Sequence, residues 1–128
     1  MTEEEFDNYL ESIGGLENGF YPDRPKIMTS GICEMGPGWY ELVKNLIDEL
    51  ITAGWDKQIC QIKEKFGTLR FYVNSASDEC YEIISKYEKL SSTVCESCGE
   101  PGVIRQGGWI QTLCDEHSGG REPFPPRP

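Results

Sequence analysis

The sequence predicts an α+β fold, in which helices pack on a small antiparallel β-hairpin or sheet and a C-terminal Cys3His unit resembles a zinc ribbon or truncated treble clef. Three observations predict it. Apolar residues recur at helical spacing in three segments, a fourth alternates around a glycine, and two short cysteine-containing arcs follow. A chain of 128 residues supports one modest core. We expect that core over residues 1–92, a metal-binding unit packed on it over 93–118, and a flexible proline-rich tail over 119–128.

The two arcs have the spacing of a tetrahedral metal site. Two residues separate Cys95 from Cys98, fifteen separate Cys98 from Cys114, and two separate Cys114 from His117. Each short arc brings two ligands to one ion, as in structural zinc sites. The alternative is that these cysteines form disulfides or stay as free thiols. An odd remainder of three other cysteines argues against a secreted disulfide framework.

The segment between the arcs is predicted to form two strands, 103–105 and 109–113, joined by a turn over 106–108. Gly99 and Gly102 suit the tight turns around the sulfurs, which often need a positive φ. Four protein ligands would leave no open position for water on the ion. The expected cofactor is therefore a structural Zn²⁺ rather than a catalytic one.

Three helices are predicted for the core, at about residues 3–13, 38–53 and 77–91. Thr2 and Glu5 have the spacing of a capping box at the start of the first helix. The second carries the clearest stripe at i, i+3, i+4 and i+7. Its members are Trp39, Leu42, Val43, Leu46, Ile47, Leu50 and Ile51. The segment 14–37 shows no clear period, so its role stays open.

Residues 59–74 are predicted to form a hairpin. A two-residue loop at Gly67–Thr68 suits a type II′ turn and would place Lys65 opposite Arg70. Alternation then puts most apolar side chains on an inner face, namely Cys60, Ile62, Phe66, Leu69, Phe71 and Val73. Glu64 would share that apolar side, which indicates either an edge position or a wrong register.

The outer face of this hairpin is expected to carry Lys63, Lys65, Arg70 and Tyr72. One interpretation is a small anion site, in which the cations and the tyrosine hydroxyl bind a phosphate or carboxylate. The other is that these cations pair with the protein's own acids, which are plentiful.

The charge distribution limits the partners. The formal net charge is −10, with twelve acids against three bases in residues 1–56. Such a protein is repelled by phosphate backbones, so nucleic acid is disfavoured as a direct partner. An acidic face could meet a basic partner protein, or acidity could serve solubility alone. The acidic N-terminus and the lack of a long apolar run predict a soluble, cytoplasmic protein with no membrane partner. Oligomeric state is not predicted.

Catalysis is not expected, and no catalytic residue is predicted. His117 is the only histidine and is assigned to the metal, so a Ser-His or Cys-His pair is not available. The sequence also lacks G-x-x-x-x-G-K-[ST] and G-x-G-x-x-G phosphate loops. A zinc deaminase would need an open coordination position and a glutamate two residues after a ligand histidine, and the sequence predicts neither.

Two stretches resemble a family of small bacterial and bacteriophage zinc-ribbon-like proteins. They are KEKFGTLRFY at 63–72 and the pair C-x-x-C-G-x-P-G and G-W-x-x-T-L-C-D-x-H within 95–117. The resemblance covers roughly residues 38–117 and implies a prokaryotic or phage setting, without supplying a mechanism. The leading hypothesis is a phage-encoded, non-enzymatic inhibitor or sponge in host-defence evasion, acting in the host cytoplasm. It would bind a host protein or a small anionic, nucleotide-like ligand. The alternatives are a zinc-ribbon accessory factor of a nucleic-acid machine and a purely structural protein-interaction module.

Overall fold

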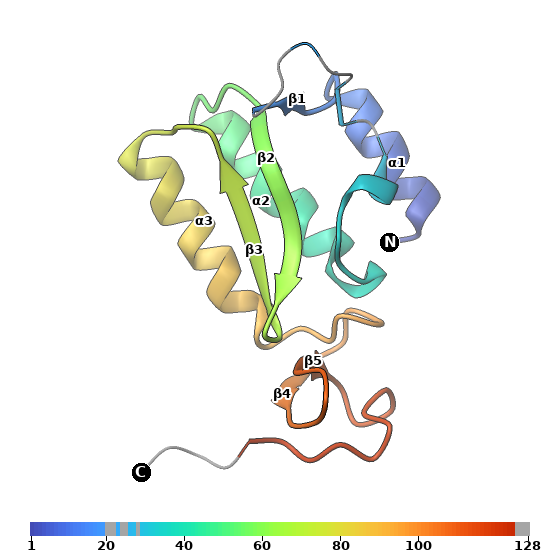
Figure 1. Cartoon of the computed structure of the whole chain (residues 1–128). Helices are drawn as coiled ribbons and strands as arrows, with labels where there is room; N and C mark the ends of the chain where they lie inside the picture. Colours follow the sequence, from blue (N-terminus) through green and yellow to red (C-terminus); the bar gives the residue numbers. More distant parts are fainter. Residues whose placement is uncertain (20–22, 24–25, 28, 125–128) are drawn as a thin grey trace.

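The chain folds as an α+β structure with a layer of helices on one face of a small sheet, in a computed structural model (Figure 1). The structure describes residues 1–19, 23, 26–27 and 29–124. The arrangement of helices on a small sheet confirms the predicted α+β fold class. The helices are α1 (Glu3–Ser12), α2 (Tyr40–Thr52) and α3 (Asp78–Ser91). The strands are β1 (Glu17–Asn18), β2 (Gln58–Lys65), β3 (Thr68–Val73), β4 (Val103–Arg105) and β5 (Gln111–Leu113).

The three helices form within two residues of the predicted bounds. Thr2 caps α1 with the predicted capping box, because its hydroxyl accepts from the backbone N–H of Glu5 and the Glu5 carboxylate accepts from the N–H of Thr2. A short 3₁₀ turn (Pro37–Trp39) leads into α2, and Ser77 caps α3. The apolar stripe of α2 forms the centre of the core, where Val43, Leu46, Ile47 and Leu50 are fully buried.

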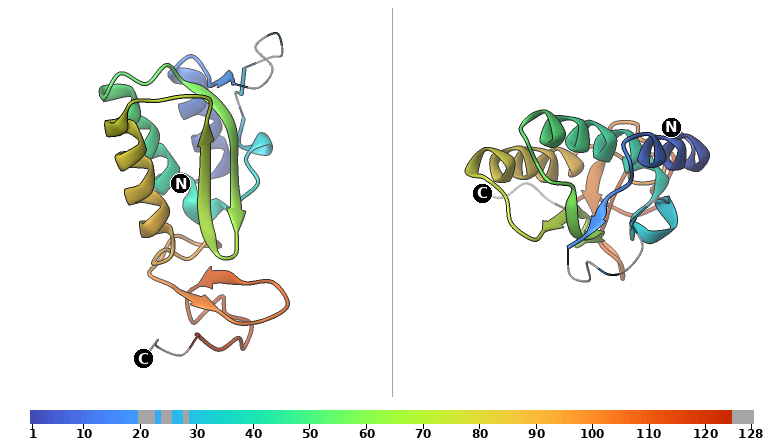
Figure 2. Two further views of the ribbon diagram at one scale, coloured as in Figure 1. Left: turned by 60° about the vertical axis from the view of Figure 1, so that its left-hand side comes forward. Right: turned by 90° about the horizontal axis from the view of Figure 1, so that it is seen from above.

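The sheet has the order β1-β2-β3, and the helices lie on one side of it (Figure 2). Strand β1 pairs with β2 in parallel, so part of the segment 14–37 forms the edge of the sheet rather than an irregular connection. Further along, the Glu34 backbone exchanges hydrogen bonds with β2, through the carbonyl of Ile62 and the N–H of Glu64. Among the described residues no helix covers the other side of the β2–β3 hairpin (Figure 2), and this surface is called the open face below.

The predicted hairpin register is wrong by two residues. Lys65 pairs with Thr68 and Lys63 with Arg70, so the loop is Phe66–Gly67 instead of Gly67–Thr68. Both loop residues have positive φ, 53° and 84°, as in a type I′ turn. Two contacts with Gly67, one within the hairpin and one from β5, explain the choice. The Glu64 carboxylate accepts from the N–H of Gly67 at 2.7 Å, and the Thr112 hydroxyl donates to the carbonyl of Gly67 at 2.6 Å.

Because the shift is an even number, most side chains keep their predicted faces. Ile62, Leu69 and Phe71 are buried against the helices. Two residues differ. Phe66 lies in the turn and is 66% exposed, and a bulge between Ile59 and Gln61 makes Ile59 the buried residue in place of Cys60.

The metal-binding unit lies beyond the end of the sheet at which β2 turns into β3 (Figure 1). Its hairpin pairs Val103 with Leu113 and Arg105 with Gln111, so the second predicted strand is two residues shorter than expected. Residues 106–110 form the connecting loop, called the 106–110 loop below. Pro123 forms a bridge with Arg105, and Phe124 donates to the carbonyl of Ile104. The first part of the predicted flexible tail is therefore held beside β4, and 125–128 lie outside the described residues.

Candidate metal centre

The first arc forms a tight turn between α3 and β4. The backbone N–H of Cys95 donates to the carbonyl of Glu100 at 2.7 Å, and the N–H of Gly99 donates to the carbonyl of Cys95 at 2.8 Å. Gly99 has the positive φ expected of this turn, 85°. Gly102 does not, and close packing explains that glycine instead. A Cβ there would lie 3.0 Å from the Cys95 nitrogen and from the Leu113 carbonyl carbon.

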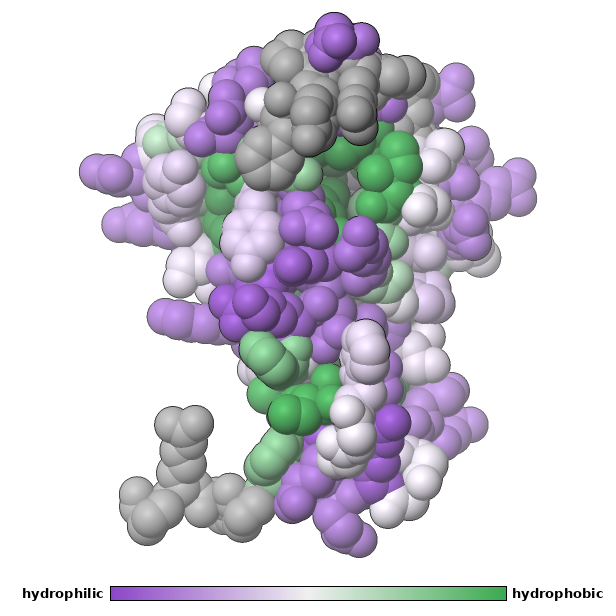
Figure 3. Space-filling model, viewed as in Figure 1, coloured by the Kyte–Doolittle hydropathy of each residue, from purple (hydrophilic) through white to green (hydrophobic). Residues whose placement is uncertain are grey.

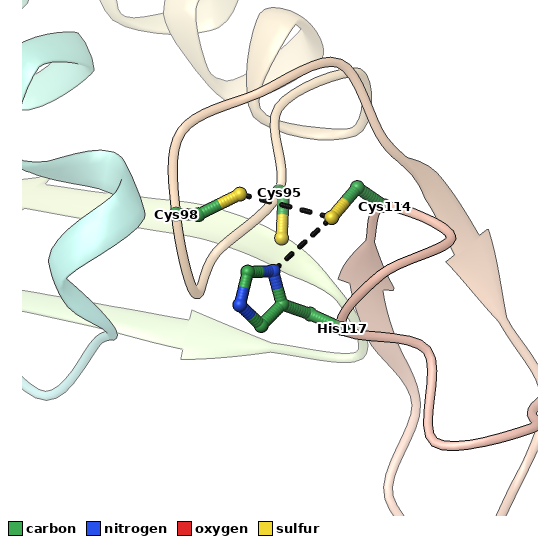
Figure 4. A group of neighbouring side chains, drawn as sticks. All are labelled: Cys95, Cys98, Cys114 and His117. Atoms are coloured by element: carbon green, nitrogen blue, oxygen red, sulfur yellow. Dashed lines mark hydrogen bonds between the residues drawn. The ribbon is translucent and has the colours of Figure 1, made fainter.

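The second arc begins where β5 ends. The backbone N–H of His117 donates to the carbonyl of Cys114 at 3.2 Å, which closes the turn that carries both side chains. The four predicted ligands therefore come together from two separate turns, and their side chains point toward one another (Figure 4). The four ligand atoms, from Cys95, Cys98, Cys114 and His117, all lie within 4.8 Å of one another.

The spacing of these atoms fits a single tetrahedral ion. The Cys98 and Cys114 sulfurs are 3.7 Å apart, and the Cys114 sulfur lies 3.2 Å from Nδ1 of His117. A tetrahedral ion with bonds of about 2.3 Å to sulfur holds two sulfurs about 3.8 Å apart. All six cysteines are free, so the disulfide alternative is not what the structure contains. The group can hold a metal ion.

The thiols influence each other's ionisation. Burial raises the pKa of Cys95, but backbone N–H groups of Cys114, Cys98 and Ser97 outweigh it and lower the pKa to about 7. A backbone N–H of Glu100 lowers the pKa of Cys98, yet desolvation and the sulfurs of Cys95 and Cys114 raise it to about 11. Ionisation of one thiol thus makes ionisation of its neighbour less favourable. A cation bound between the sulfurs would remove this repulsion, because metal binding favours the deprotonated thiols.

Arg105 organises the unit around the metal centre, and sequence reasoning did not identify it. Arg105 is buried, with only 5% of the residue exposed. Its guanidinium donates to the carbonyls of Leu113 and Arg121, at 2.9 and 3.0 Å, and to the Asp115 carboxylate at 2.8 Å. Asp115 lies inside the second arc. Arg105 therefore joins β4, the end of β5 and the ligand-bearing turn.

The Gly36–Gly38 segment fits closely against the first arc. A Cβ at Gly38 would lie 2.1 Å from the carbonyl oxygen of Cys95, and one at Gly36 would lie 2.5 Å from that of Glu96. The buried Glu96 accepts from the N–H of Gly36 through its carboxylate and from that of Gly38 through its carbonyl. These glycines allow the start of α2 to contact the metal-binding turn directly.

Two further hydrogen bonds attach the unit to the core. The Trp39 indole donates to the carbonyl of Val94 at 2.8 Å, and the buried Thr112 hydroxyl reaches the β2–β3 turn. Trp39 is predicted from sequence as a core residue, but nothing in the pattern indicates that its indole also binds Val94. The metal-binding turns are thus fixed both to α2 and to the hairpin.

The predicted anion-site residues lie on the open face. Lys63 and Arg70 are direct cross-strand partners, Lys65 follows toward the turn, and Tyr72 pairs with Gln61. Among the described residues none of the three cations makes an ion pair. The Lys63 amine lies 5.8 Å from the centre of the Tyr72 ring, and the Lys65 amine 5.7 Å from that of Phe66. In the part of the chain described, the cluster thus lacks a direct ion pair, and the exposed Glu34 lies beside Lys63 as its partner in a parallel bridge.

No family model matches the chain, and neither the curated proteins nor the solved structures give a significant match. Within the residues described, the helices are too short or too polar to cross a bilayer. Function is therefore argued from the two sites above.

Proposed function

We propose that the protein is a non-catalytic binding protein stabilised by one structural Zn²⁺, and that it holds a small anionic ligand on its open face. The ligand set supports zinc, because three thiolates and an imidazole at these spacings suit a tetrahedral ion and leave it no open position. The same assignment supports a non-enzymatic role, since the only histidine is a metal ligand.

The observation that carries the anion proposal is the juxtaposition of Lys63 and Arg70. Like charges directly opposite each other destabilise a sheet by about 0.2–1 kcal/mol. Lys26, Lys44, Lys86 and Arg105 each make an ion pair, whereas the open-face cations make none among the described residues. The Nε of Arg70 is buried and has no hydrogen-bond partner there. An anion on the open face would supply the missing charge.

The biological setting is carried by the resemblance of the hairpin and arc motifs to small phage and bacterial proteins. We propose a phage-encoded inhibitor or sponge of host defence, which sequesters its ligand by binding alone. The open face fits that role because its cations lie close together on two paired strands.

Calorimetric titration with inorganic pyrophosphate tests the anion site. Replacing Lys63 or Arg70 by Gln should weaken binding about tenfold or more, because a hydrogen bond to a charged group contributes about 1.5–3 kcal/mol. The control is Lys26→Gln, which removes the same charge from an ion pair elsewhere and should leave the affinity within about twofold. Absence of binding, or equal affinity in all variants, would overturn the proposal.

A further inference from the structure

A groove lies between the β2–β3 turn and the 106–110 loop. It has a volume of about 350 Å³ and is lined by Glu64, Lys65, Phe66, Trp109, Ile110 and the glycines at 107 and 108. Its two aromatic side chains are unusually exposed, 66% for Phe66 and 63% for Trp109. Figure 3 shows hydrophobic side chains gathered where the β2–β3 turn meets the β4–β5 hairpin, directly below the hydrophilic surface of β2 and β3. The groove therefore adjoins the open face.

Glu64 holds the two sides of this groove together. One oxygen of its carboxylate accepts from the Gly67 N–H at 2.7 Å, and the other accepts from the Trp109 indole at 3.2 Å. This explains why a glutamate lies on the apolar side of the hairpin. Each carboxylate oxygen can accept a second hydrogen bond, so Glu64 keeps acceptor capacity toward a ligand.

Lys65 links the groove to the cation cluster. It lines the groove, and Lys63 lies two residues away on the same face of β2, which corresponds to about 6.6 Å along a strand. A ligand that begins between the aromatic rings thus meets one cation at the rim and a second further along the strand. Across from Lys63 lies Arg70.

These features specify a ligand with three parts. Exposed aromatic rings suit a flat ring system that can stack on them. A carboxylate with free acceptor positions suits a ring whose edge carries N–H donors. The row of cations suits one or more phosphates. The volume is near the lower end of the about 300–1,000 Å³ typical of ligand pockets, which suits a single base rather than several.

We propose that this groove binds a free nucleotide whose base carries N–H donors, such as a guanine nucleotide, with the base beside Phe66 and Trp109 and the phosphates toward Lys65 and Lys63. The inference rests on the proposed function and names its ligand class. A free nucleotide fits better than a nucleic-acid strand, because a net charge of −10 repels an extended phosphate backbone.

The test compares GDP, guanosine and inorganic pyrophosphate on the full chain by calorimetry. GDP should bind at least about fivefold more tightly than pyrophosphate, because stacking of one base strengthens binding about 5- to 150-fold. Trp109→Leu should remove most of that advantage and leave pyrophosphate binding within about twofold. Trp109 is exposed, so this change should not unfold the protein. The matched control is Tyr81→Leu, which replaces an aromatic residue 47% exposed on α3.

Tryptophan fluorescence gives a second readout. Trp39 and Trp55 are buried, whereas Trp109 is exposed, so stacking of a base should quench mainly the exposed emission. GDP should quench it and pyrophosphate should not. In Trp109→Leu the GDP-dependent quenching should disappear.

The outcomes separate the inference from the function on which it rests. If pyrophosphate binds but GDP binds no more tightly, the nucleotide inference is overturned and the anion site stands. Binding of guanosine that depends on Trp109, without any binding of pyrophosphate, would overturn the proposed function and support the base-binding groove. A single-stranded oligonucleotide that binds more tightly than GDP would overturn the choice of a free nucleotide.

Discussion

The α+β core and the metal-binding unit are held together by different means. Between residues 3 and 91 one cluster of buried apolar side chains runs from Phe6 to Tyr87 across all three helices and the β2–β3 hairpin. Between residues 95 and 117 the buried set consists of Cys95, Glu96, Arg105, Thr112 and Leu113. Most of these are polar or are metal ligands, and none belongs to the apolar cluster.

This difference indicates what a metal ion held by the four candidate ligands would contribute to a small fold. A segment of this size cannot bury enough apolar surface to offset the conformational entropy lost on folding. Four ligands on one ion fix two turns at once. The hydrogen bonds that Glu96 accepts from Gly36 and Gly38, and the one that Thr112 donates to Gly67, then orient the unit on the core. Arg105 joins the parts of the unit to one another. The core, in contrast, should fold without the metal.

The largest expected effect comes from removing one metal ligand. Structural zinc contributes about 10–16 kcal/mol in zinc-finger peptides, so Cys114→Ser should abolish stoichiometric zinc and unfold the unit. Elemental analysis measures the zinc, and limited proteolysis should cut within 95–117 while 3–91 stays resistant. Cys60→Ser, which changes a cysteine outside the cluster, should keep one zinc per chain. If Cys114→Ser is as resistant to proteolysis within 95–117 as the unmodified protein, the unit does not depend on the metal and the contrast with the core is wrong.

A cavity in the core should destabilise the core rather than the metal-binding unit. Leu46 is fully buried on α2, so Leu46→Ala should lower the free energy of unfolding of the core by about 2–5 kcal/mol. Urea unfolding followed by far-UV circular dichroism measures this. Leu90→Ala, at a position 43% exposed, should change it by less than about 0.5 kcal/mol. Equal effects of the two variants would show that α2 is not the centre of the core.

Replacing Arg105 tests the polar support of the unit. Arg105→Met keeps the apolar part of the side chain but leaves the Leu113 and Arg121 carbonyls without this donor. The free energy of unfolding of the unit should fall by about 1–3 kcal/mol, and the core should keep its stability. Competition with a chelator should show weaker zinc retention in Arg105→Met. Lys89→Met, at an exposed position on α3, should retain zinc like the unmodified protein.

The smallest effect concerns a solvent-exposed polar contact between α2 and α3. The Lys86 amine donates to Glu49 at 2.8 Å, and this bond, together with the one from the Tyr87 hydroxyl, lowers the pKa of Glu49. A carboxylate with a lowered folded-state pKa stabilises the protein above its ordinary pKa of 4.5 and loses that contribution as the pH falls through the lowered value.

The melting temperature of Glu49→Gln should therefore be lower than that of the unmodified protein near neutral pH, and the two should converge in acid. Glu82→Gln, on the exposed side of α3, provides the control and should change the melting temperature little. A gap between Glu49→Gln and the unmodified protein that widens in acid would contradict the assigned direction.

Local patterns predicted the helices and the metal ligands. The stripe on α2, the cap at Thr2 and the spacing of the two arcs each depend on residues close in sequence. The hairpin register depends also on Thr112 of β5, which is distant in sequence and, together with the nearby Glu64, holds Gly67 in the turn. A type I′ loop with Phe66 at positive φ is contrary to local preference, so the turn residues alone favoured another register.

The supporting residues of the metal centre could not be predicted for the same reason. Arg105 reads in sequence as an alternating strand residue, and only the fold brings it to Asp115 and Arg121. Strand β1 has two residues and no pattern of its own, because its pairing depends on β2. The groove beside Trp109 likewise arises from a turn and a loop that are distant in the chain.

Hydrogen exchange measured with and without zinc tests most directly whether the metal takes the place of a core in the unit. With zinc bound, amides in both regions should be protected. After chelation, protection should be lost within 95–117 and kept in α2 and the β2–β3 hairpin. Protection in 95–117 that persists without metal would contradict the account, as would a purified protein that contains no zinc.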